Sequence, residues 1–214
     1  MEKMKLISLL SGGIDSPVSS YIMMKKADII FVHFHNQTLQ TENVKNKVIK
    51  TAQKACEKAG KKSKLYLVPF RELQQELIKT VGSKFRMIVY RRIMFKIAEK
   101  ILLKEKAQGF VTGDNIGQVA SQTLDNLDVI YNATKYPIFS PLLSFDKIEI
   151  IKKAEKIGTF SISIEPYPDC CSFMIAKHPE TKACLNNIKK IESNIDIDRL
   201  VSEVFKKTII INVS

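Results

Sequence analysis

Short apolar runs alternate with longer amphipathic stretches along most of the chain. Runs rich in β-branched and aromatic residues predict strands, and apolar residues spaced three or four apart predict helices. This alternation is typical of βαβ units, so we expect a doubly wound α/β fold with a parallel sheet and helices on both faces. The predicted strands are 5–10, 28–35, 64–70, 109–113 and 136–143, and the predicted helices are 16–26, 42–60, 72–106 with a break near Gly82, 117–127 and 146–158.

The pattern changes after Gly158, where residues 161–184 are rich in proline, cysteine and polar side chains. Such a stretch is typical of a functional loop. Two short helices are predicted at 182–193 and 196–207, followed by an apolar run at 208–213. No interdomain linker is visible, and 214 residues are enough for one core. We expect one domain over 1–214, with a core at 1–160, a cysteine-bearing loop at 161–184 and a helical tail at 185–214.

The first predicted strand and helix are joined by the sequence SGGIDS, residues 11–16. A glycine turn before a helix presents backbone N–H groups and a positive dipole end, so it favours an anion such as phosphate. Ser16 is the expected N-cap, with Pro17 at the first helical position. The lysine of a GxxxxGK[ST] loop is missing. Asp15 would repel phosphate unless a cation lay between them, so we expect Asp15 to hold Mg²⁺.

Lysine and arginine outnumber aspartate and glutamate by 34 to 22, which gives a formal net charge of +12. This excess favours a polyanionic partner, with nucleic acid ahead of a membrane, although an ordinary lysine-rich solvated surface explains the composition equally well. Two basic stripes with spacings of about four residues are candidate contacts to RNA phosphates. The first comprises Arg92, Lys96, Lys100 and Lys104, with Arg91 beside it, and the second comprises Lys47, Lys50, Lys54, Lys58 and Lys61.

The apolar run at the N-terminus is about six residues long, too short for a signal peptide or a membrane span. We therefore expect a cytoplasmic protein, whose cysteines are free, catalytic or metal-binding rather than joined in structural disulfides. Cys56 lies in a predicted helix and is expected to be a packed small residue. Cys170, Cys171 and Cys184 all lie in the loop after the core.

Four segments resemble one family. SGGIDS resembles the pyrophosphate loop of ATP pyrophosphatases, which split ATP into AMP and pyrophosphate. TGDNIGQVASQTLDNL, SPLLSFDKIEIIKKAEKIGT and EPYPDCCSFMIAKHPETKA are similar, in that order, to the catalytic domain of tRNA 4-thiouridine synthetases, a family also associated with thiazole formation for thiamine. The resemblance covers nearly the whole chain. It implies the adenine nucleotide alpha hydrolase-like fold, with ATP and Mg²⁺ as cofactors.

The resemblance assigns candidate nucleotide-binding residues by position. Lys147 matches a lysine tied to activity in the family, where a cation stabilises charge on the departing pyrophosphate; the alternative is an exposed lysine at a helix start. The residues that match the pyrophosphate loop are Ser11, Gly12, Gly13, Asp15 and Ser16, and those in the second nucleotide-side segment are Gly113 and Gln118.

The second predicted strand ends in His33, Phe34 and His35. Ligands bind beyond the carboxyl ends of parallel strands, so we expect His33 and Phe34 to contact the nucleotide. The two histidines lie on one side of the strand, a spacing that also suits a metal ion. Because no third ligand is evident, a hydrogen-bonded or solvent-facing pair is the favoured interpretation.

The resemblance places the family's sulfur-transferring cysteine at Cys171, with Cys170 as the alternative. The chemistry needs a thiolate, which nearby Lys177 and His178 favour. Cys184 is the candidate for the thiol that resolves the persulfide, since a vicinal Cys170–Cys171 bridge would be strained. An iron–sulfur cluster on these cysteines is a weaker interpretation, because no CxxC pair supports it.

The resemblance therefore implies an ATP-dependent tRNA sulfurtransferase that adenylates a uridine and replaces its C4 oxygen with persulfide sulfur. The expected partners are tRNA, a cysteine desulfurase or another sulfur donor, and a second copy of the chain. The family's N-terminal RNA-capturing region and rhodanese domain are not found here, so a separate RNA-binding protein is a further expected partner. Two alternatives remain open: sulfur transfer to a small molecule or carrier protein for thiamine, and a non-catalytic subunit that carries a nucleotide or persulfide.

Overall fold

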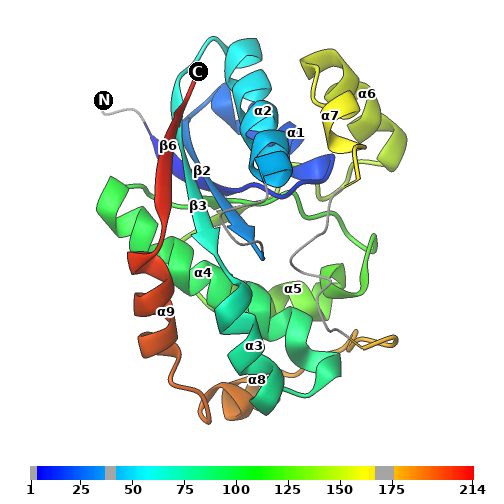
Figure 1. The fold of residues 1–214 in the computed structure, drawn as a ribbon. Coiled ribbons are helices and arrows are strands. Elements are labelled where there is room, and N and C mark those ends of the chain that lie inside the picture. The colour runs from blue at the N-terminus through cyan, green and yellow to red at the C-terminus, as the bar shows by residue number, and fades with distance from the viewer. Residues whose placement is uncertain (1–3, 37–41, 167–175) are drawn as a thin grey trace.

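A computed structural model describes residues 4–36, 42–166 and 176–214, and its centre is a six-stranded sheet flanked by helices (Figure 1). The strand order is β5-β4-β1-β2-β3-β6. All neighbouring strands are parallel except β6, which pairs antiparallel with β3. The strands are β1 (Lys5–Leu9), β2 (Asp28–His35), β3 (Ser63–Pro69), β4 (Phe110–Val111), β5 (Ile138–Phe139) and β6 (Ile209–Val213).

Helices cover both faces of this sheet, which confirms the predicted doubly wound arrangement. In Figure 1, α1, α2, α6 and α7 lie on one side, and α3, α4, α5, α8 and α9 lie on the other. The helices are α1 (Asp15–Met24), α2 (Glu42–Ala59), α3 (Arg71–Thr80), α4 (Arg86–Glu105), α5 (Leu124–Tyr131), α6 (Lys147–Ile157), α7 (Phe160–Ser163), α8 (Leu185–Glu192) and α9 (Ile197–Lys206), with 3-10 turns at Ser83–Phe85 and Ala120–Gln122.

The alternation of side chains along β2 builds two separate cores. Ile30, Val32 and Phe34 pack on one face of the sheet with α3, α4 and α9. Ile29 and Phe31 point to the opposite face and pack with α1 and α2. Because successive strand residues point to opposite sides, one apolar run supplies both cores.

Strand β1 lies at the point where the strand order reverses, with β2 on one side and β4 on the other. The chain moves outward from β1 through β2 and β3, and then returns to form β4 and β5. In such sheets the connections leave the carboxyl ends of the two central strands in opposite directions and open a crevice between them. The fold therefore places a binding crevice where the turn after β1 meets the segment after β4.

The helix predicted at 117–127 begins later than expected. Residues Ala120–Gln122 form a 3-10 turn, and α5 begins at Leu124. Thr123 is its N-cap, and its hydroxyl accepts a hydrogen bond from the Asn126 N–H at 3.2 Å. A threonine favours the N-cap position of a helix. Here this preference sets the helix start, and the apolar spacing of residues 117–122 does not.

The first basic stripe does not form an exposed face. Helix α4 is covered by the sheet, α5 and α9, and Arg92 is only 3% exposed. Its guanidinium donates to both carboxylate oxygens of Glu192 at 2.7 and 2.9 Å and also to the carbonyl of Val129. The prediction that Arg92 contacts RNA is wrong, because the four-residue spacing follows the helix but does not show which side other helices cover. Lys96 and Lys100 are half-buried, and Lys104 at the end of the helix is exposed.

The second stripe is also only partly exposed. Lys47 is 4% exposed, and its ammonium donates to the carbonyls of Ser163 and Glu165 at 2.9 and 2.7 Å. Burial lowers the pKa of Lys47, and the nearby Glu165 carboxylate opposes this effect. Lys47 therefore ties α2 to the end of α7 and does not face solvent.

Candidate functional site

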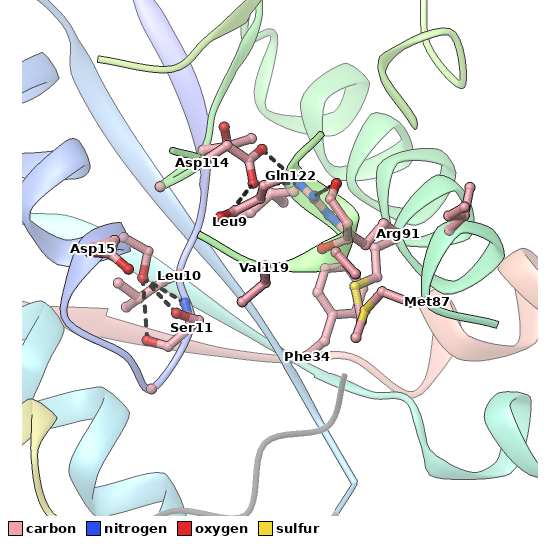
Figure 2. A pocket seen from close by; sticks show the side chains of 18 of the residues that line it. Leu9, Leu10, Ser11, Asp15, Phe34, Met87, Arg91, Asp114, Val119 and Gln122 are labelled. Carbon is pink, nitrogen blue, oxygen red and sulfur yellow. Dashed lines mark hydrogen bonds and ion pairs between the residues drawn. The ribbon is translucent and has the colours of Figure 1, made fainter. Parts of the chain in front are cut away.

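A cavity of about 470 Å³ opens at the carboxyl ends of β1, β2 and β4. Figure 2 shows Ser11 and Asp15 on one side of it and Met87 and Arg91 of α4 on the other. The volume lies in the range of small-molecule sites. Its walls come from 9–12, 15–16, 32–34, 87–88, 91, 94, 112–114, 119–122 and 179–180. The crevice predicted from the topology is thus a pocket shared by five segments.

The turn after β1 is closed by the two serines at its ends. The Ser16 hydroxyl accepts a hydrogen bond from the Ser11 N–H at 2.8 Å, and the two hydroxyl oxygens are 3.0 Å apart. Helix α1 begins at Asp15 with Ile14 as its N-cap, so the prediction that Ser16 caps the helix is wrong. The two serine hydroxyls form hydrogen bonds within this closed turn. No side chain therefore caps the start of α1.

The glycine turn retains the features of an anion site. Gly12 lines the pocket, and the Gly13 N–H donates to the Ser11 hydroxyl at 3.2 Å. The first N–H groups of α1 have no partner within the helix, and the positive end of its dipole lies at the pocket. Pro17 is the third helical residue, where a missing N–H removes no helical bond.

Gly113 allows the segment after β4 to touch the start of α1. A Cβ at Gly113 would lie 2.6 Å from the Ser16 nitrogen and 2.8 Å from its Cα. Both contacts are to backbone, which cannot rotate away as a side chain can. The absence of a side chain at Gly113 therefore allows the segment after β4 to lie directly against the start of α1.

We expect Gly113→Ala to lower the free energy of unfolding by about 1–3 kcal/mol and to weaken ligand binding in the pocket, because the strand and helix must separate. Gly82→Ala is the matched control, since a Cβ there meets nothing within 4 Å. Urea denaturation of both variants measures the difference. Equal stabilities would show that the Gly113 backbone adjusts without loss.

Lys147 and Asp15 are 132 residues apart in sequence but form an ion pair in the structure, with 2.8 Å between Nζ and Oδ1. Lys147 is the first residue of α6, which begins with a capping box formed by Asp146 and Glu149. This cap fixes the start of the helix and so directs Lys147 toward the turn. Asp15 lines the pocket and Lys147 lies beside it.

The opposite wall of the pocket carries an ion pair that sequence reasoning missed. The Asp114 carboxylate accepts hydrogen bonds from Arg91 at 2.6 and 2.8 Å and from the Tyr131 hydroxyl at 2.7 Å. Burial raises the pKa of Asp114, but the Arg91 charge and the hydrogen bonds outweigh it, so the pKa lies below its usual value. Arg91 therefore belongs to the pocket wall and not to an exposed basic face. The sequence TGD at 112–114 indicated that the end of β4 contributes to a site. It did not indicate that Asp114 pairs with Arg91 of α4.

His33 and Phe34 both line the pocket, although they lie on opposite faces of β2. The His33 Nδ1 donates to the Leu10 carbonyl at 2.8 Å, since a carbonyl can only accept. Burial lowers the pKa of His33 from 6.5 to about 4. His33 is therefore neutral at pH 7. The rings of His33 and His35 are stacked with centroids 6.4 Å apart.

The lowered pKa of His33 predicts a pH-dependent stability. The unfolded histidine binds a proton near pH 6.5 and the folded one only near 4, so stability is complete above pH 6.5 and falls as the pH drops toward 4. The loss amounts to about 3 kcal/mol. We expect His33→Asn, which keeps a donor for Leu10 and does not titrate, to remove this part of the pH profile. The exposed His178→Asn is the control, and identical profiles for His33→Asn and the wild type would contradict the assignment.

The remaining predicted residues lie outside the pocket lining. Gln118 is exposed, and Gln122 of the same segment lines the pocket in its place. Cys184 is exposed at the N-cap of α8, four residues after the pocket residue Glu180. Cys170 and Cys171 lie outside the described residues. Cys56 is fully buried, as predicted, and burial raises the pKa of its thiol to about 11.

Asn126 joins the segment before Cys184 to the pocket wall. Asn126 is fully buried, and its amide nitrogen donates to the carbonyls of Ala120 and Glu180 at 2.7 Å each. Its side-chain oxygen accepts from the Ala183 N–H at 3.0 Å. One side chain thus fixes the approach to Cys184 relative to the pocket.

Within the parts of the chain that are described, no cluster of three or more His, Cys, Asp or Glu side chains could hold a metal ion. A single carboxylate at a phosphate site nevertheless suits Mg²⁺, which is held in proteins by one or two carboxylates together with substrate phosphates. Asp15 fits that role. Among the same residues, no helix is both long and apolar enough to cross a bilayer.

The strand order, the glycine turn and the pocket at the switch point define an α/β domain of the adenine nucleotide alpha hydrolase type. The model of the family described as thiamine biosynthesis protein (ThiI) matches residues 2–197. The chain belongs to this ThiI family.

Two solved structures illustrate the relationship. A 4-thiouridine synthetase, determined as an RNA complex with bound ATP, is 41% identical with a TM-score of 0.92, and the match covers 99% of this chain. It covers 55% of that protein, so the chain spans little more than half its length. An NH3-dependent NAD synthetase from Campylobacter jejuni subsp. jejuni NCTC 11168 is 14% identical with a TM-score of 0.56, over 97% of this chain and 86% of the other, and shows the fold alone.

Proposed function

We propose that this chain is an ATP-dependent sulfurtransferase that adenylates a tRNA uridine and replaces its C4 oxygen with sulfur, forming 4-thiouridine. The observation that carries the proposal is the 41% identity, over 99% of the chain, to a 4-thiouridine synthetase with RNA and ATP. The pocket supports it, because the glycine turn and Asp15 lie at one end and apolar side chains such as Phe34 and Met87 line another part. Such a division suits a triphosphate and a purine.

In the first half of the reaction, the turn after β1 binds the phosphates of ATP through the N–H groups at the start of α1. Asp15 would hold Mg²⁺, which neutralises phosphate charge when bound. The side chain of Lys147 is 45% exposed and pairs with Asp15, so it lies within reach of the same phosphates. Its ammonium stabilises the negative charge that develops as pyrophosphate leaves. The uridine O4 then carries AMP.

In the second half, a persulfide on Cys171 supplies the sulfur. Its terminal sulfur attacks C4 of the uridine and AMP leaves with the original oxygen, so that C4 is bonded through sulfur to the Cys171 Sγ. The Cys184 thiolate then attacks that Sγ and breaks the sulfur–sulfur bond. The products are 4-thiouridine and a Cys171–Cys184 disulfide, which a thiol reductant must reduce before the next cycle.

The partners of this reaction are a tRNA, a cysteine desulfurase that loads Cys171, and a separate RNA-binding protein or a second copy of the chain. The net charge of +12 supports contact with RNA. Because Arg91 and Arg92 are paired inside the protein, Lys96, Lys100 and Lys104 are what remains of the first stripe as RNA candidates. Charge reversal at Lys96 and Lys100 tests them through the salt dependence of tRNA binding.

The family description, thiamine biosynthesis protein, favours a second candidate, sulfur transfer to a small molecule or carrier protein. The two candidates share the ATP pocket and differ in the acceptor. A third possibility, a non-catalytic subunit, would bind ATP or AMP without turnover.

The test is AMP release from ATP and Mg²⁺ by the purified chain, with and without unmodified tRNA, followed by analysis of the RNA for 4-thiouridine when a desulfurase and cysteine are added. AMP formation that requires tRNA, together with thiolated RNA, is the expected result. If AMP forms only when a thiamine-pathway acceptor is added, that acceptor and not tRNA is the substrate. Nucleotide binding without turnover in either case would exclude an enzyme.

A further inference from the structure

The side-chain amide of Asn126 binds backbone atoms of two other segments. Asn126 is fully buried in α5, and its amide nitrogen donates to the carbonyl of Ala120 on the pocket wall and to that of Glu180, at 2.7 Å each. Its amide oxygen accepts from the Ala183 N–H at 3.0 Å. An amide has two donor hydrogens and one acceptor oxygen, and all are engaged here. A carboxylate of the same size has no donor, so this arrangement requires asparagine.

Further hydrogen bonds hold the same segment in place. The Thr123 hydroxyl donates to the Thr181 carbonyl at 2.7 Å. The Glu180 N–H donates to the Lys84 carbonyl at 3.0 Å, and the Glu180 carboxylate lies 3.6 Å from the Lys84 ammonium. Residues 180–183 are therefore fixed from two sides, by the start of α5 and by the 3-10 turn before α4.

This fixed segment joins the pocket to Cys184. Pro179 and Glu180 line the pocket, and Cys184 is exposed at the N-cap of α8. A chain spans at most about 3.6 Å per residue, so the Cα atoms of Glu180 and Cys184 lie within about 14 Å of each other. Helix α8 is held in turn by Ile188, which is fully buried. Cys184 is thus kept close to the pocket from both directions along the chain.

We propose that Asn126 is a positioning residue for release of 4-thiouridine, because it holds Cys184 close enough to the pocket for its thiolate to attack Cys171 Sγ. This inference rests on the proposed function. The attack forms a bond between the two cysteine sulfurs and breaks the bond from Cys171 Sγ to the sulfur on C4. That sulfur leaves with the electron pair as 4-thiouridine, and the two cysteines are oxidised to a disulfide, which a thiol reductant reduces.

The experiment follows a single turnover in the wild type and in Asn126→Asp. Cys171 is loaded with persulfide by a desulfurase and cysteine, the chain is separated from both, and ATP, Mg²⁺ and unmodified tRNA are added. The products measured are AMP, RNA joined to Cys171 as a disulfide, and free 4-thiouridine. The rate at which the joined RNA is released reports the last step alone. We expect Asn126→Asp to slow this release about 10- to 100-fold, as for a reacting group misplaced by about 1 Å.

Asn132→Asp is the matched control, because Asn132 lies at the C-cap of the same helix and is exposed. It should release RNA at the wild-type rate. Dithiothreitol, added after the joined RNA has formed, should release 4-thiouridine from Asn126→Asp as fast as from Cys184→Ala, since the added thiol replaces the Cys184 thiolate in both. A general weakening of the fold would neither accumulate joined RNA nor respond to the added thiol.

Thr123→Val tests the same segment with a smaller change. It removes the hydrogen bond to the Thr181 carbonyl but keeps the Asn126 amide, so it should slow release in the same direction by a smaller factor. If Asn126→Asp does not fold, Thr123→Val decides the question.

Two results would overturn the inference while leaving the proposed function intact. One is release at the Asn132→Asp rate by Asn126→Asp, or by Thr123→Val where Asn126→Asp does not fold. The other is an equal loss of AMP formation and product release in Asn126→Asp, with no joined RNA. A wild-type chain that forms no AMP or no 4-thiouridine would instead overturn the proposed function and this inference with it.

Discussion

Lys147→Ala is expected to reduce AMP formation from ATP by about 100- to 1000-fold, the effect usual for loss of one charge-stabilising donor at a reaction centre. The Lys147 ammonium is 2.8 Å from Asp15, which lines the pocket, and in the proposed reaction the departing pyrophosphate gains charge there. The loss should fall mainly on the turnover number, because the charge develops in the transition state and the turn still binds ATP. Steady-state AMP release over a range of ATP concentrations measures kcat and KM separately.

Lys152→Ala is the matched control for this result. Lys152 lies on the same helix, α6, and is exposed. The Lys152→Ala substitution therefore removes the same charge from the same helix without altering the pocket. Thermal unfolding should be similar for both variants, since the Lys147 side chain is 45% exposed. If Lys147→Ala is as active as Lys152→Ala, Lys147 has no role in the reaction and is an ordinary surface lysine at a helix start.

Cys171→Ala is expected to abolish formation of 4-thiouridine while AMP formation from ATP continues. The thiol that carries the persulfide has no substitute in the proposed reaction, but it takes no part in adenylation. Cys184→Ala should permit RNA to become attached to the protein through a disulfide and then block its release. Both products are measured in one reaction that contains tRNA, ATP, a desulfurase and cysteine.

Cys56→Ala provides the control, because Cys56 is fully buried in α2 and its thiol is protonated at neutral pH, with a pKa raised to about 11. It should thiolate RNA at nearly the wild-type rate. Equal loss of adenylation and thiolation in Cys171→Ala would contradict the separation of the two half-reactions. Free release of thiolated RNA by Cys184→Ala would remove Cys184 from the mechanism.

Most of the fold was predictable from local patterns. The apolar runs and amphipathic stretches predicted the strands and the long helices, and the break near Gly82 falls between α3 and α4 as expected. Periodicity works here because strands and helices place side chains at fixed intervals. The antiparallel pairing of β6 with β3 was not predicted, since an apolar run predicts a strand but not which neighbour it pairs with.

The site was predictable where a motif is contiguous. The turn at 11–16 and the strand end at His33 and Phe34 were named from local sequence, Gly113 was named from the resemblance, and the structure brings these segments to one pocket. Gln122 was missed in favour of Gln118, because both lie in one loop and their orientation depends on the 3-10 turn. The signal that could have found Gln122 is the nearby TGD carboxylate, which needs donors around it.

The sequence by itself determined the class of the domain, the glycine turn after β1 and membership of the ThiI family, because these depend on residues that are close together in the chain. Only the tertiary structure decided which charges are free. Arg92 pairs with Glu192 on α8, and Lys147 meets Asp15 across 132 residues. A charge in a sequence looks the same whether water or a carboxylate will surround it. That outcome depends on how helices pack over one another, and an ion pair forms only once packing has brought its two distant partners together.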